Sequence, residues 1–324
     1  MTLETPVVAA DADAPEVLVV AKLWPPMMEA LHGAFRVHDR IHETDPAAFD
    51  AAAPRIRAIA ASGESKVGRD LMARMPALEI ISVFGVGYDG IDVAVARERG
   101  IHVTHTPNVL NDEVADLALA LMLAVARRIP QVDRYVRDGK WKQGQAPLAR
   151  KVSGARLGIV GLGRIGNAIA KRAEAFDMSI AYTSRQPKAD SSYRYFPTPV
   201  ALAAEVDFLV VITPGGAATR KLINAEVLTA LGSQGYLINV ARGSVVDETA
   251  LIAALQNGTI AGAGLDVFEA EPNVPDALCA LDNVVLTPHI GSATWQTRRA
   301  MGDLSFGNLQ AHFAGKPLLS PVPQ

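Results

Sequence analysis

The sequence predicts an α/β protein made of two doubly wound parallel-sheet domains. Short buried runs that look like strands alternate with helical stretches, which is typical of βαβ units and a parallel sheet. The alternation restarts after Lys151, so two sets of such units are present. The length of 324 residues exceeds one ordinary core, and it suits two domains of about 150 residues each.

In the first half of the chain, the apolar runs that predict strands lie between helical stretches. These strands are expected at residues 16–21, 58–60, 80–84 and 101–104. A helix is expected to start at residues 28–32. A longer helix is expected over residues 111–128, with Asn111 or Asp112 as its cap and Pro130 ending it.

In the second half, the apolar runs are more numerous, and two helices are expected between them. One helix covers residues 166–176, and another covers residues 248–256 and ends at Gly258. The strands are expected at residues 156–160, 178–183, 206–212, 236–240, 262–267 and 284–287.

The composition excludes several classes of protein. With 31 Lys+Arg against 34 Asp+Glu the net charge is -3, so no excess of positive charge is available for nucleic acid. Cys279 is the single cysteine, which rules out an internal disulfide and a thiolate metal site. The histidines show no spacing typical of a ligand set, and we expect no metal.

The N-terminal segment and the apolar runs argue against export and against a membrane. Glu4, Asp11 and Asp13 stand where a signal peptide would need positive charge. The longest apolar run, Leu117–Ala126, is about half the length that spans a bilayer. We therefore expect a soluble cytoplasmic protein, and the lone thiol of Cys279 agrees with that location.

A glycine-rich motif lies directly between a predicted strand and a predicted helix. Gly161 permits a tight turn, Gly163 lets the backbone approach a pyrophosphate, and Gly166 allows close packing of helix and strand. An ordinary glycine-rich connection is the alternative, but the flanking elements favour a dinucleotide site. The expected site includes the intervening residues Leu162, Arg164 and Ile165.

The end of the next strand indicates which dinucleotide is bound. An NAD site usually carries an acid there, which accepts hydrogen bonds from the ribose. Here Ser184 and Arg185 follow the strand, and Asp177 precedes it. A hydroxyl and a guanidinium can hold a 2′-phosphate, so NADP(H) is favoured over NAD(H). The alternative is that Arg185 and Lys188 belong only to a solvated loop.

Three further segments place chemically active residues just after predicted strands. These residues are Arg242, the acids Asp266, Glu269 and Glu271, and His289. Taken singly, each has a structural alternative. Arg242 could form a surface ion pair, Glu271 could be a turn residue, and His289 could be a capped histidine or one whose hydrogen bonds are satisfied within the protein. Asp266 could be a structural cap. Because open α/β sheets bind ligands at the carboxyl ends of their strands, their convergence favours a site.

This combination suits the reduction of a 2-keto acid. The Arg242 guanidinium can grip a carboxylate with two hydrogen bonds and polarise the ketone. His289 can donate a proton to the carbonyl oxygen while nicotinamide delivers hydride to the carbon. A nearby glutamate would stabilise the imidazolium and keep the acid form populated near neutral pH.

These residues belong to motifs that together resemble one family. The chain resembles the D-isomer-specific 2-hydroxyacid dehydrogenases, in particular the branch of glyoxylate/hydroxypyruvate and hydroxyphenylpyruvate reductases. The resemblance covers nearly the whole chain. Its motifs are residues 82–92, 106–109, 113–116, 161–166, 238–248, 265–272 and 287–291.

The resemblance implies a role for particular residues of the site. Arg242 is implied to bind and polarise the substrate, and His289 to be the acid/base, with Glu271 as its partner. The backbone N–H groups of Val86 and Gly87 are implied to hold the substrate carboxylate.

The resemblance also implies the contacts of the nicotinamide and the architecture. Asp266 would bind the carboxamide, in a pocket lined by Val240. A Rossmann cofactor domain at residues 106–290 would be inserted into a flavodoxin-like substrate domain at residues 1–105 and 291–324. A homodimer is implied, with the Leu117–Ala126 helix and the arm through Trp141 at its interface.

The sequence thus predicts an NADP-dependent enzyme that reduces glyoxylate, hydroxypyruvate or a similar acid to the D-2-hydroxy acid. Alternatives are another 2-keto acid (hydroxyphenylpyruvate, 2-ketogluconate or the precursor of D-lactate) and the use of NAD. Two binding roles without catalysis also stay open: a dinucleotide-sensing corepressor and a plain dinucleotide-binding protein. The chain ends about 35 residues after His289, so we expect none of the regulatory domain found in many phosphoglycerate dehydrogenases.

Overall fold

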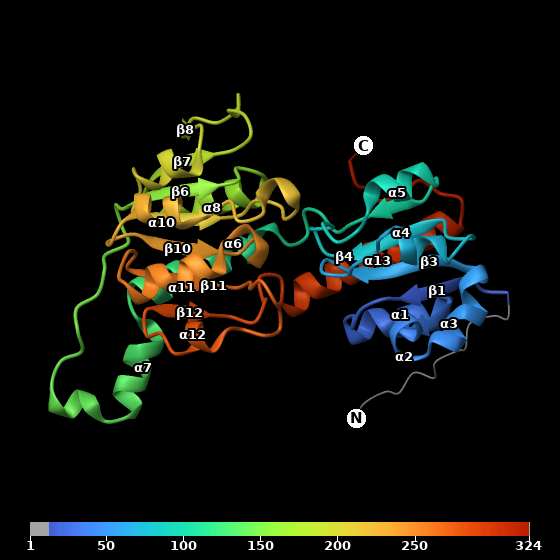
Figure 1. Cartoon of the computed structure of the whole chain (residues 1–324), viewed down its shortest axis with the longest axis horizontal. Coiled ribbons are helices and arrows are strands. Elements are labelled where there is room, and N and C mark those ends of the chain that lie inside the picture. Colours follow the sequence, from blue (N-terminus) through green and yellow to red (C-terminus); the bar gives the residue numbers. More distant parts are fainter. Residues whose placement is uncertain (1–12, 324) are drawn as a thin grey trace. The chain divides into compact units, whose positions relative to one another are not determined.

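The chain contains two compact units, each built around one parallel sheet (Figure 1). A computed structural model describes residues 13–323. The discontinuous unit comprises the described residues up to Leu110 and those from Thr294 on, and the continuous unit comprises Asn111–Ala293. Glu4 and Asp11, used above against a signal peptide, lie outside the described residues.

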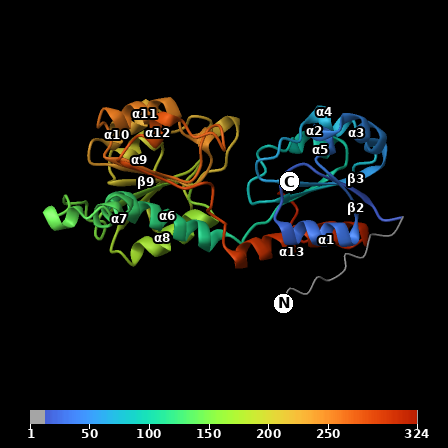
Figure 2. The ribbon, with the colours of Figure 1, turned by 90° about the horizontal axis from the view of Figure 1, so that it is seen from below.

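The discontinuous unit has five parallel strands in the order β2-β1-β3-β4-β5, which is the flavodoxin-like order. Its strands are β1 (Glu16–Val19), β2 (Arg36–Asp39), β3 (Ile56–Ser62), β4 (Ile80–Phe84) and β5 (His102–Thr104). Its helices are α1 (Pro25–Ala34), α2 (Ile41–Thr44), α3 (Pro46–Ala52), α4 (Arg69–Ala73), α5 (Val93–Glu98) and α13 (Trp295–Phe313). Figure 2 shows α1 and α13 on one face of the sheet and α2 to α5 on the other.

The continuous unit has seven parallel strands in the order β12-β11-β10-β9-β6-β7-β8. Its strands are β6 (Arg156–Val160), β7 (Ser179–Thr183), β8 (Arg194–Phe196), β9 (Phe208–Val211), β10 (Tyr236–Asn239), β11 (Gly262–Leu265) and β12 (Val284–Leu286). Its helices are α6 (Asn111–Ala126), α7 (Ile129–Arg137), α8 (Arg164–Glu174), α9 (Pro199–Ala203), α10 (Ala225–Leu231), α11 (Glu248–Gln256) and α12 (Asp276–Cys279). Helices α6 and α8 cover one face, and α9 to α12 cover the other (Figure 2).

The strand order of the continuous unit reverses at β6, which pairs with both β7 and β9. This is the Rossmann arrangement with one additional strand, and ligands bind outside the carboxyl ends of the strands at such a reversal. Helices cover both faces, so the central strands are continuous apolar runs: all four residues of β9 and of β11 are buried. The predicted fold class, two doubly wound parallel α/β domains, is confirmed; the roles of the two domains stay predictions.

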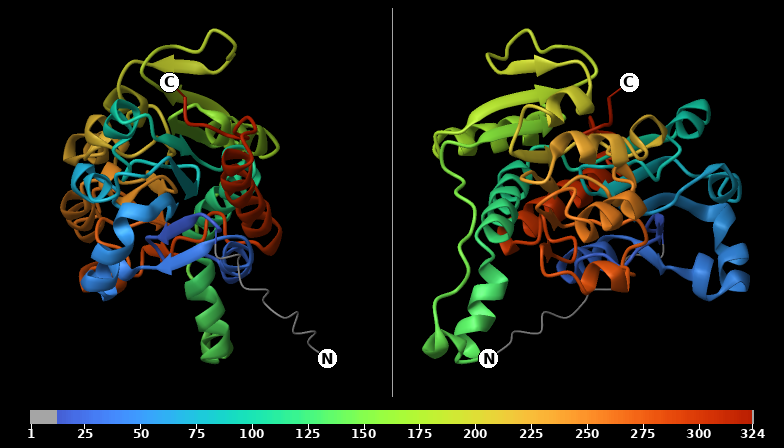
Figure 3. Two further views of the ribbon diagram at one scale, coloured as in Figure 1. Left: turned by 90° about the vertical axis from the view of Figure 1, so that its right-hand side faces the viewer. Right: turned by 60° about the vertical axis from the view of Figure 1, so that its left-hand side comes forward.

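An arm projects from the continuous unit (Figure 3). It consists of residues 129–149: helix α7, a short 3-10 helix at Lys140–Gln143 and an extended segment. Large apolar side chains on it are exposed, with Val136 at 55%, Trp141 at 67% and Leu148 at 97%. Such a concentration of exposed apolar residues is typical of a surface that packs against another molecule.

The structure corrects the expected elements at several places. Helix α6 ends at Ala126, two residues earlier than expected, and Pro130 lies in the first turn of α7. Proline is tolerated there because the first turn needs no amide donor. Helix α8 begins two residues earlier than expected. The elements β2, β8 and α13 were not predicted.

Within residues 13–323, no helix is both long enough and apolar enough to cross a bilayer.

Candidate active site

Two glycines of the predicted dinucleotide motif are required by packing. Gly161 has a φ of 106°, and an added Cβ there would lie 2.8 Å from the Ile212 carbonyl oxygen. A Cβ on Gly166 would overlap the carbonyl oxygen of Gly161. The turn after β6 is therefore tight, and helix α8 approaches it as closely as the backbone permits.

The third glycine of the motif, Gly163, has empty space beside its Cα, and a ligand could approach the backbone there. A Cβ on Gly163 would meet no protein atom within 4 Å. Gly163 precedes the first turn of α8, which has no side-chain cap and no acid. Free N–H groups at a helix N-terminus are suited to an anion, so these residues fit a dinucleotide pyrophosphate. Of the intervening residues, Leu162 is buried, Ile165 is half-buried and Arg164 is exposed.

The loop after β7 is closed by its own hydrogen bonds. The Ser184 hydroxyl donates to the Gln186 carbonyl (2.6 Å), and the Lys188 N–H donates to the Tyr182 hydroxyl (2.7 Å). Arg185 is exposed and takes part in no hydrogen bond or ion pair with the described residues. The loop thus presents a guanidinium at the carboxyl end of β7, where an acid would stand in an NAD site.

Arg242 extends from a loop that Asn239 organises at the end of β10. The buried Asn239 amide donates to the Arg242 carbonyl (3.1 Å), and its oxygen accepts from the Ala241 N–H (3.1 Å). A Cβ on Gly243 would overlap the Phe268 carbonyl. The loop carrying Arg242 therefore packs directly against the turn that follows β11. Val240, expected to line the nicotinamide pocket, is buried in the same loop.

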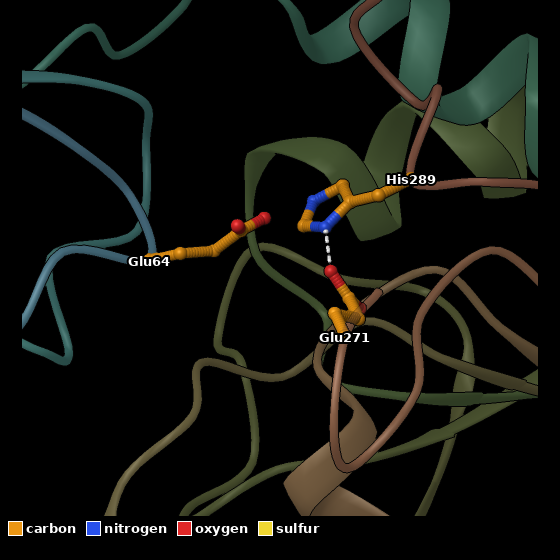
Figure 4. A group of neighbouring side chains, drawn as sticks. All are labelled: Glu64, Glu271 and His289. Atoms are coloured by element: carbon orange, nitrogen blue, oxygen red, sulfur yellow. Dashed lines mark hydrogen bonds and ion pairs between the residues drawn. The ribbon is translucent and has the colours of Figure 1, made fainter. Parts of the chain in front are cut away.

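His289 and Glu271 form a hydrogen-bonded pair. His289 Nδ1 lies 2.7 Å from Glu271 Oε2, as the dashed line in Figure 4 shows. Because a carboxylate can only accept, Nδ1 carries the proton and Nε2 is the exchanging nitrogen. The Phe268 N–H donates to the other Glu271 oxygen (2.8 Å). Both side chains are half-buried, so the histidine has a fixed orientation and access to a ligand.

Asp266 holds the loop that carries His289. The Thr287 hydroxyl and the N–H groups of Ile290 and Gly291 donate to its carboxylate at 2.7, 2.8 and 2.8 Å. His289 itself has a φ of 53°, and its N–H donates to the Asp266 carbonyl (2.9 Å). Burial raises the pKa of the Asp266 carboxyl above 3.8, although these hydrogen bonds oppose the rise. Asp266 is therefore a cap of the His289 loop, whatever else it contacts.

The two predicted carboxylate-binding amides lie in the discontinuous unit. Val86 and Gly87 follow β4, and neither N–H donates to an acceptor among the described residues. The Val86 carbonyl lies 2.9 Å from Nδ1 of His105, and the Gly85 carbonyl accepts from the Thr106 N–H (2.8 Å). His105 was not among the residues predicted from the sequence. The signal was present, since His105 directly precedes the motif at residues 106–109.

The predicted residues therefore fall into two groups. Arg242, Glu271, His289, Asp266 and the glycine loop share the carboxyl edge of the seven-stranded sheet. Val86 and Gly87 lie at the corresponding edge of the five-stranded sheet.

Comparison with known proteins identifies the family. A sequence model described as the NAD binding domain of D-isomer specific 2-hydroxyacid dehydrogenases matches residues 119–291. The chain is 54% identical over 267 residues to glyoxylate/hydroxypyruvate reductase A of Arabidopsis thaliana, covering 82% of this chain and 85% of that protein. It is 53% identical over 270 residues to hydroxyphenylpyruvate reductase of Plectranthus scutellarioides, covering 83% and 86%.

A solved structure agrees with these relatives. The NADPH-dependent glyoxylate/hydroxypyruvate reductase of Sinorhizobium meliloti, in complex with NADP and malonate, superposes with a TM-score of 0.90 at 50% identity. The alignment covers 96% of this chain and 97% of that one. The chain therefore belongs to the D-isomer specific 2-hydroxyacid dehydrogenase family, as its motifs predicted, and is an NAD(P)-dependent oxidoreductase of that family.

Proposed function

We propose that the protein is an NADPH-dependent reductase that converts glyoxylate, hydroxypyruvate or a similar small 2-keto acid to the D-2-hydroxy acid. The observation that carries the proposal is the hydrogen bond of 2.7 Å between His289 and Glu271, at the sheet edge that also carries the glycine loop. A histidine oriented by a carboxylate is an acid that can serve a carbonyl reduction. The names of the relatives support the choice of substrate.

Each unit has its own part in this proposal. The dinucleotide-binding domain, expected at residues 106–290, corresponds to the continuous unit, and the family match at residues 119–291 supports that role. The substrate domain, expected at residues 1–105 and 291–324, corresponds to the discontinuous unit. In that unit, the N–H groups of Val86 and Gly87 donate to the substrate carboxylate.

The protein side chains bind the keto acid and supply the proton. The Arg242 guanidinium binds the carboxylate and polarises the carbonyl, which favours negative charge on its oxygen. A bound NADPH would supply the hydride that the carbonyl carbon accepts. His289 Nε2 donates a proton to the carbonyl oxygen, giving the hydroxyl. Glu271 stabilises the imidazolium before the transfer and keeps Nδ1 protonated after it. Asp266 would bind the nicotinamide carboxamide, and Val240 would line that pocket.

The loop after β7 supports NADPH over NADH. Arg185 is an exposed guanidinium without a protein partner among the described residues, so it is available to a 2′-phosphate. Ser184 lies beside it, although its hydroxyl already donates to Gln186. The NADP complex of the Sinorhizobium relative supports the same preference.

We also propose that the protein is a cytoplasmic homodimer. Helix α6 and the exposed apolar side chains of the arm supply an interface. The single exposed thiol of Cys279 is suited to a reducing compartment. A larger substrate, hydroxyphenylpyruvate, is the second candidate, because a relative of 53% identity is named for it.

The first experiment measures initial rates with glyoxylate and hydroxypyruvate, with NADPH and NADH compared at equal concentration. We expect turnover with both acids and a clear preference for NADPH. Arg185→Ala should raise the KM for NADPH about tenfold or more, because it removes a charged hydrogen bond to the 2′-phosphate. The KM for NADH should be unchanged, because NADH has no such phosphate. The control is Arg69→Ala, which removes an exposed arginine paired with Glu98 in the other unit.

The outcomes separate the parts of the proposal. Turnover with NADH preferred would keep the reductase and reject the 2′-phosphate site. Turnover only with hydroxyphenylpyruvate would change the substrate. An absence of turnover with all these acids and both cofactors would contradict the reductase.

A further inference from the structure

The two N–H groups proposed to hold the substrate carboxylate belong to consecutive peptide units. The Val86 N–H shares a peptide plane with the Gly85 carbonyl, and the Gly87 N–H shares one with the Val86 carbonyl. Because a trans peptide is planar, its N–H and C=O point in opposite directions. Whatever holds the two carbonyls therefore determines where the two N–H groups point.

Both carbonyls are held by two consecutive residues of another segment. His105 Nδ1 lies 2.9 Å from the Val86 oxygen, and the Thr106 N–H donates to the Gly85 oxygen (2.8 Å). Since a carbonyl can only accept, the imidazole carries its proton on Nδ1. His105 is 8% exposed and Thr106 is fully buried, so water does not compete with these hydrogen bonds. Each bond also polarises its peptide and strengthens the N–H on the far side as a donor.

The segment that holds the carbonyls is itself held by a residue near the C-terminus. The His105 N–H donates to the Ser320 carbonyl (3.2 Å), and the Ser320 hydroxyl donates to the His105 carbonyl (2.7 Å). Ser320 is 8% exposed. His105 is thus fixed on both sides of its own backbone and presents its ring to Val86.

Ser320 is in turn fixed by Asn308, a fully buried residue of α13. The N–H groups of Leu319 and Ser320 donate to the Asn308 oxygen at 3.0 and 3.1 Å, and its amide donates to the Ser320 hydroxyl (2.8 Å). A continuous hydrogen-bonded chain therefore runs from Asn308 through Ser320 and His105 to the peptide planes before Val86 and Gly87. All of it lies within the discontinuous unit.

We propose that His105 is a positioning residue for the substrate carboxylate, and that Ser320 and Asn308 fix it in that role. The inference rests on the proposed function of the Val86 and Gly87 amides. His105 does not touch the substrate; its Nδ1–H holds the Val86–Gly87 peptide so that the Gly87 N–H points outward. Because the carboxylate is bound in the ground state and the transition state alike, the loss of this hydrogen bond raises KM more than it lowers kcat.

The test compares two amide substitutions that differ in the position of one nitrogen. In His105→Asn the amide nitrogen takes the position of Nδ1, whereas in His105→Gln it lies one bond farther out. Both variants lose the ring contact with Tyr88, whose centroid lies 5.2 Å away, so that loss cancels between them. We expect His105→Gln to raise the KM for glyoxylate about tenfold and His105→Asn to stay within about threefold of wild type. The KM for NADPH should be unchanged in both.

A second matched pair consists of two serine-to-alanine variants, each of which removes one buried hydroxyl. Ser320→Ala deletes the hydrogen bond to the His105 carbonyl and should raise the KM for glyoxylate about threefold. Ser305→Ala deletes another buried hydroxyl of the same unit, on α13, which lies 2.9 Å from Ser82 Oγ and makes no hydrogen bond to His105, Thr106 or Ser320. It should lower Tm without changing this KM. If His105→Gln does not fold, this pair decides the question.

Oxalate binding, measured by calorimetry, separates this inference from the proposed reaction. If the wild type reduces no keto acid but binds oxalate, and His105→Gln weakens that binding while His105→Asn does not, the positioning role stands and the reaction is wrong. Equal KM values for the Asn and Gln variants in a protein that does reduce glyoxylate would overturn the positioning role. So would a Ser305→Ala effect on KM as large as that of Ser320→Ala, or a wild type that binds no oxalate and reduces nothing.

Discussion

His289 owes its orientation to hydrogen bonds that leave it little freedom. Glu271 uses one carboxylate oxygen for the His289 ring and the other for the Phe268 N–H, so its rotamer is set by the backbone. Asp266 fixes the loop on the far side of the histidine. A proton donor held in this way needs no rearrangement before the transfer, which is where preorganised sites gain their rate.

Glu271→Gln should therefore change the pH profile and leave cofactor binding intact. A neutral amide stabilises the imidazolium less than a carboxylate does, so the loss of kcat/KM for reduction should begin at lower pH than in wild type. At pH 8 we expect a fall of about tenfold or more, near the low end of the effect of a general acid. The profile of kcat/KM against pH measures the expected change in pH dependence, and the Kd for NADPH measures whether cofactor binding is intact.

His289→Asn is the reference for that experiment, because it removes the proposed acid altogether. Its activity should be lower than that of Glu271→Gln at every pH and should lose the alkaline limb. A Glu271→Gln profile identical to wild type would contradict the proposed pairing of acid and carboxylate.

The sequence predicted Arg242, Glu271 and His289 because each follows an apolar strand and belongs to a motif. It left open whether Asp266 is a cap, because that depends on the left-handed backbone of His289, which no local pattern in the sequence reveals. His105 was missed for a related reason. Its role depends on the peptide planes of Gly85–Gly87 and on Ser320, which is 215 residues away in the chain.

At the scale of elements, a charged cluster fastens the edge of the seven-stranded sheet opposite the site. Asp207, directly before β9, accepts hydrogen bonds from the Arg156 backbone (2.8 Å) and guanidinium (3.0 Å) and from Arg150 (3.0 Å). The hydrogen bond from the Arg156 side chain is the largest cause of the lowered pKa of Asp207, and burial opposes it. The carboxylate thus ties β9 to β6 at their amino ends.

Asp207→Asn should lower Tm in a pH-dependent way and leave kcat unchanged. The folded-state pKa of Asp207 lies below its ordinary value of 3.8, so its stabilisation is complete above pH 3.8 and is lost as the pH falls through the lowered pKa. At pH 7 the variant should lose about 2 kcal/mol of stability, the value of charged hydrogen bonds. Thermal unfolding measured from pH 7 down to pH 3 should show the difference in Tm between wild type and Asp207→Asn becoming smaller below pH 3.8. A Tm difference that stays constant over this range would contradict a stabilising role for the Asp207 charge.

The elements that could be predicted from the sequence are those whose buried residues form continuous apolar runs. Strands β4, β6 and β9 were found because helices cover both faces of the sheet. Strands β2 and β8 lie at the edges of their sheets and carry polar residues. Helix α13 was missed because the residues that it buries include Thr297, Gly302, Ser305 and Asn308, which form no apolar stripe.

At the scale of the whole molecule, the arm makes the homodimer testable. Val136→Glu combined with Trp141→Glu places two charges on exposed apolar positions of the arm. If two chains bury this surface together, the double variant should sediment as a single chain of 34.3 kDa, with wild type at twice that mass. Gln143→Glu, an exposed polar position of the same arm, is the control. A wild type that sediments as a monomer at micromolar concentration would contradict the proposal.

The division of one unit between the two ends of the chain has a consequence for biosynthesis. A ribosome completes residues 111–293, with the glycine loop and the His289 loop, before it reaches α13 and Ser320. Domains fold as units, so the discontinuous unit can form only after residues 294–323, with α13 and Ser320, have been made. The order of translation thus makes the segment proposed to orient Val86 and Gly87 the last of these parts to be supplied.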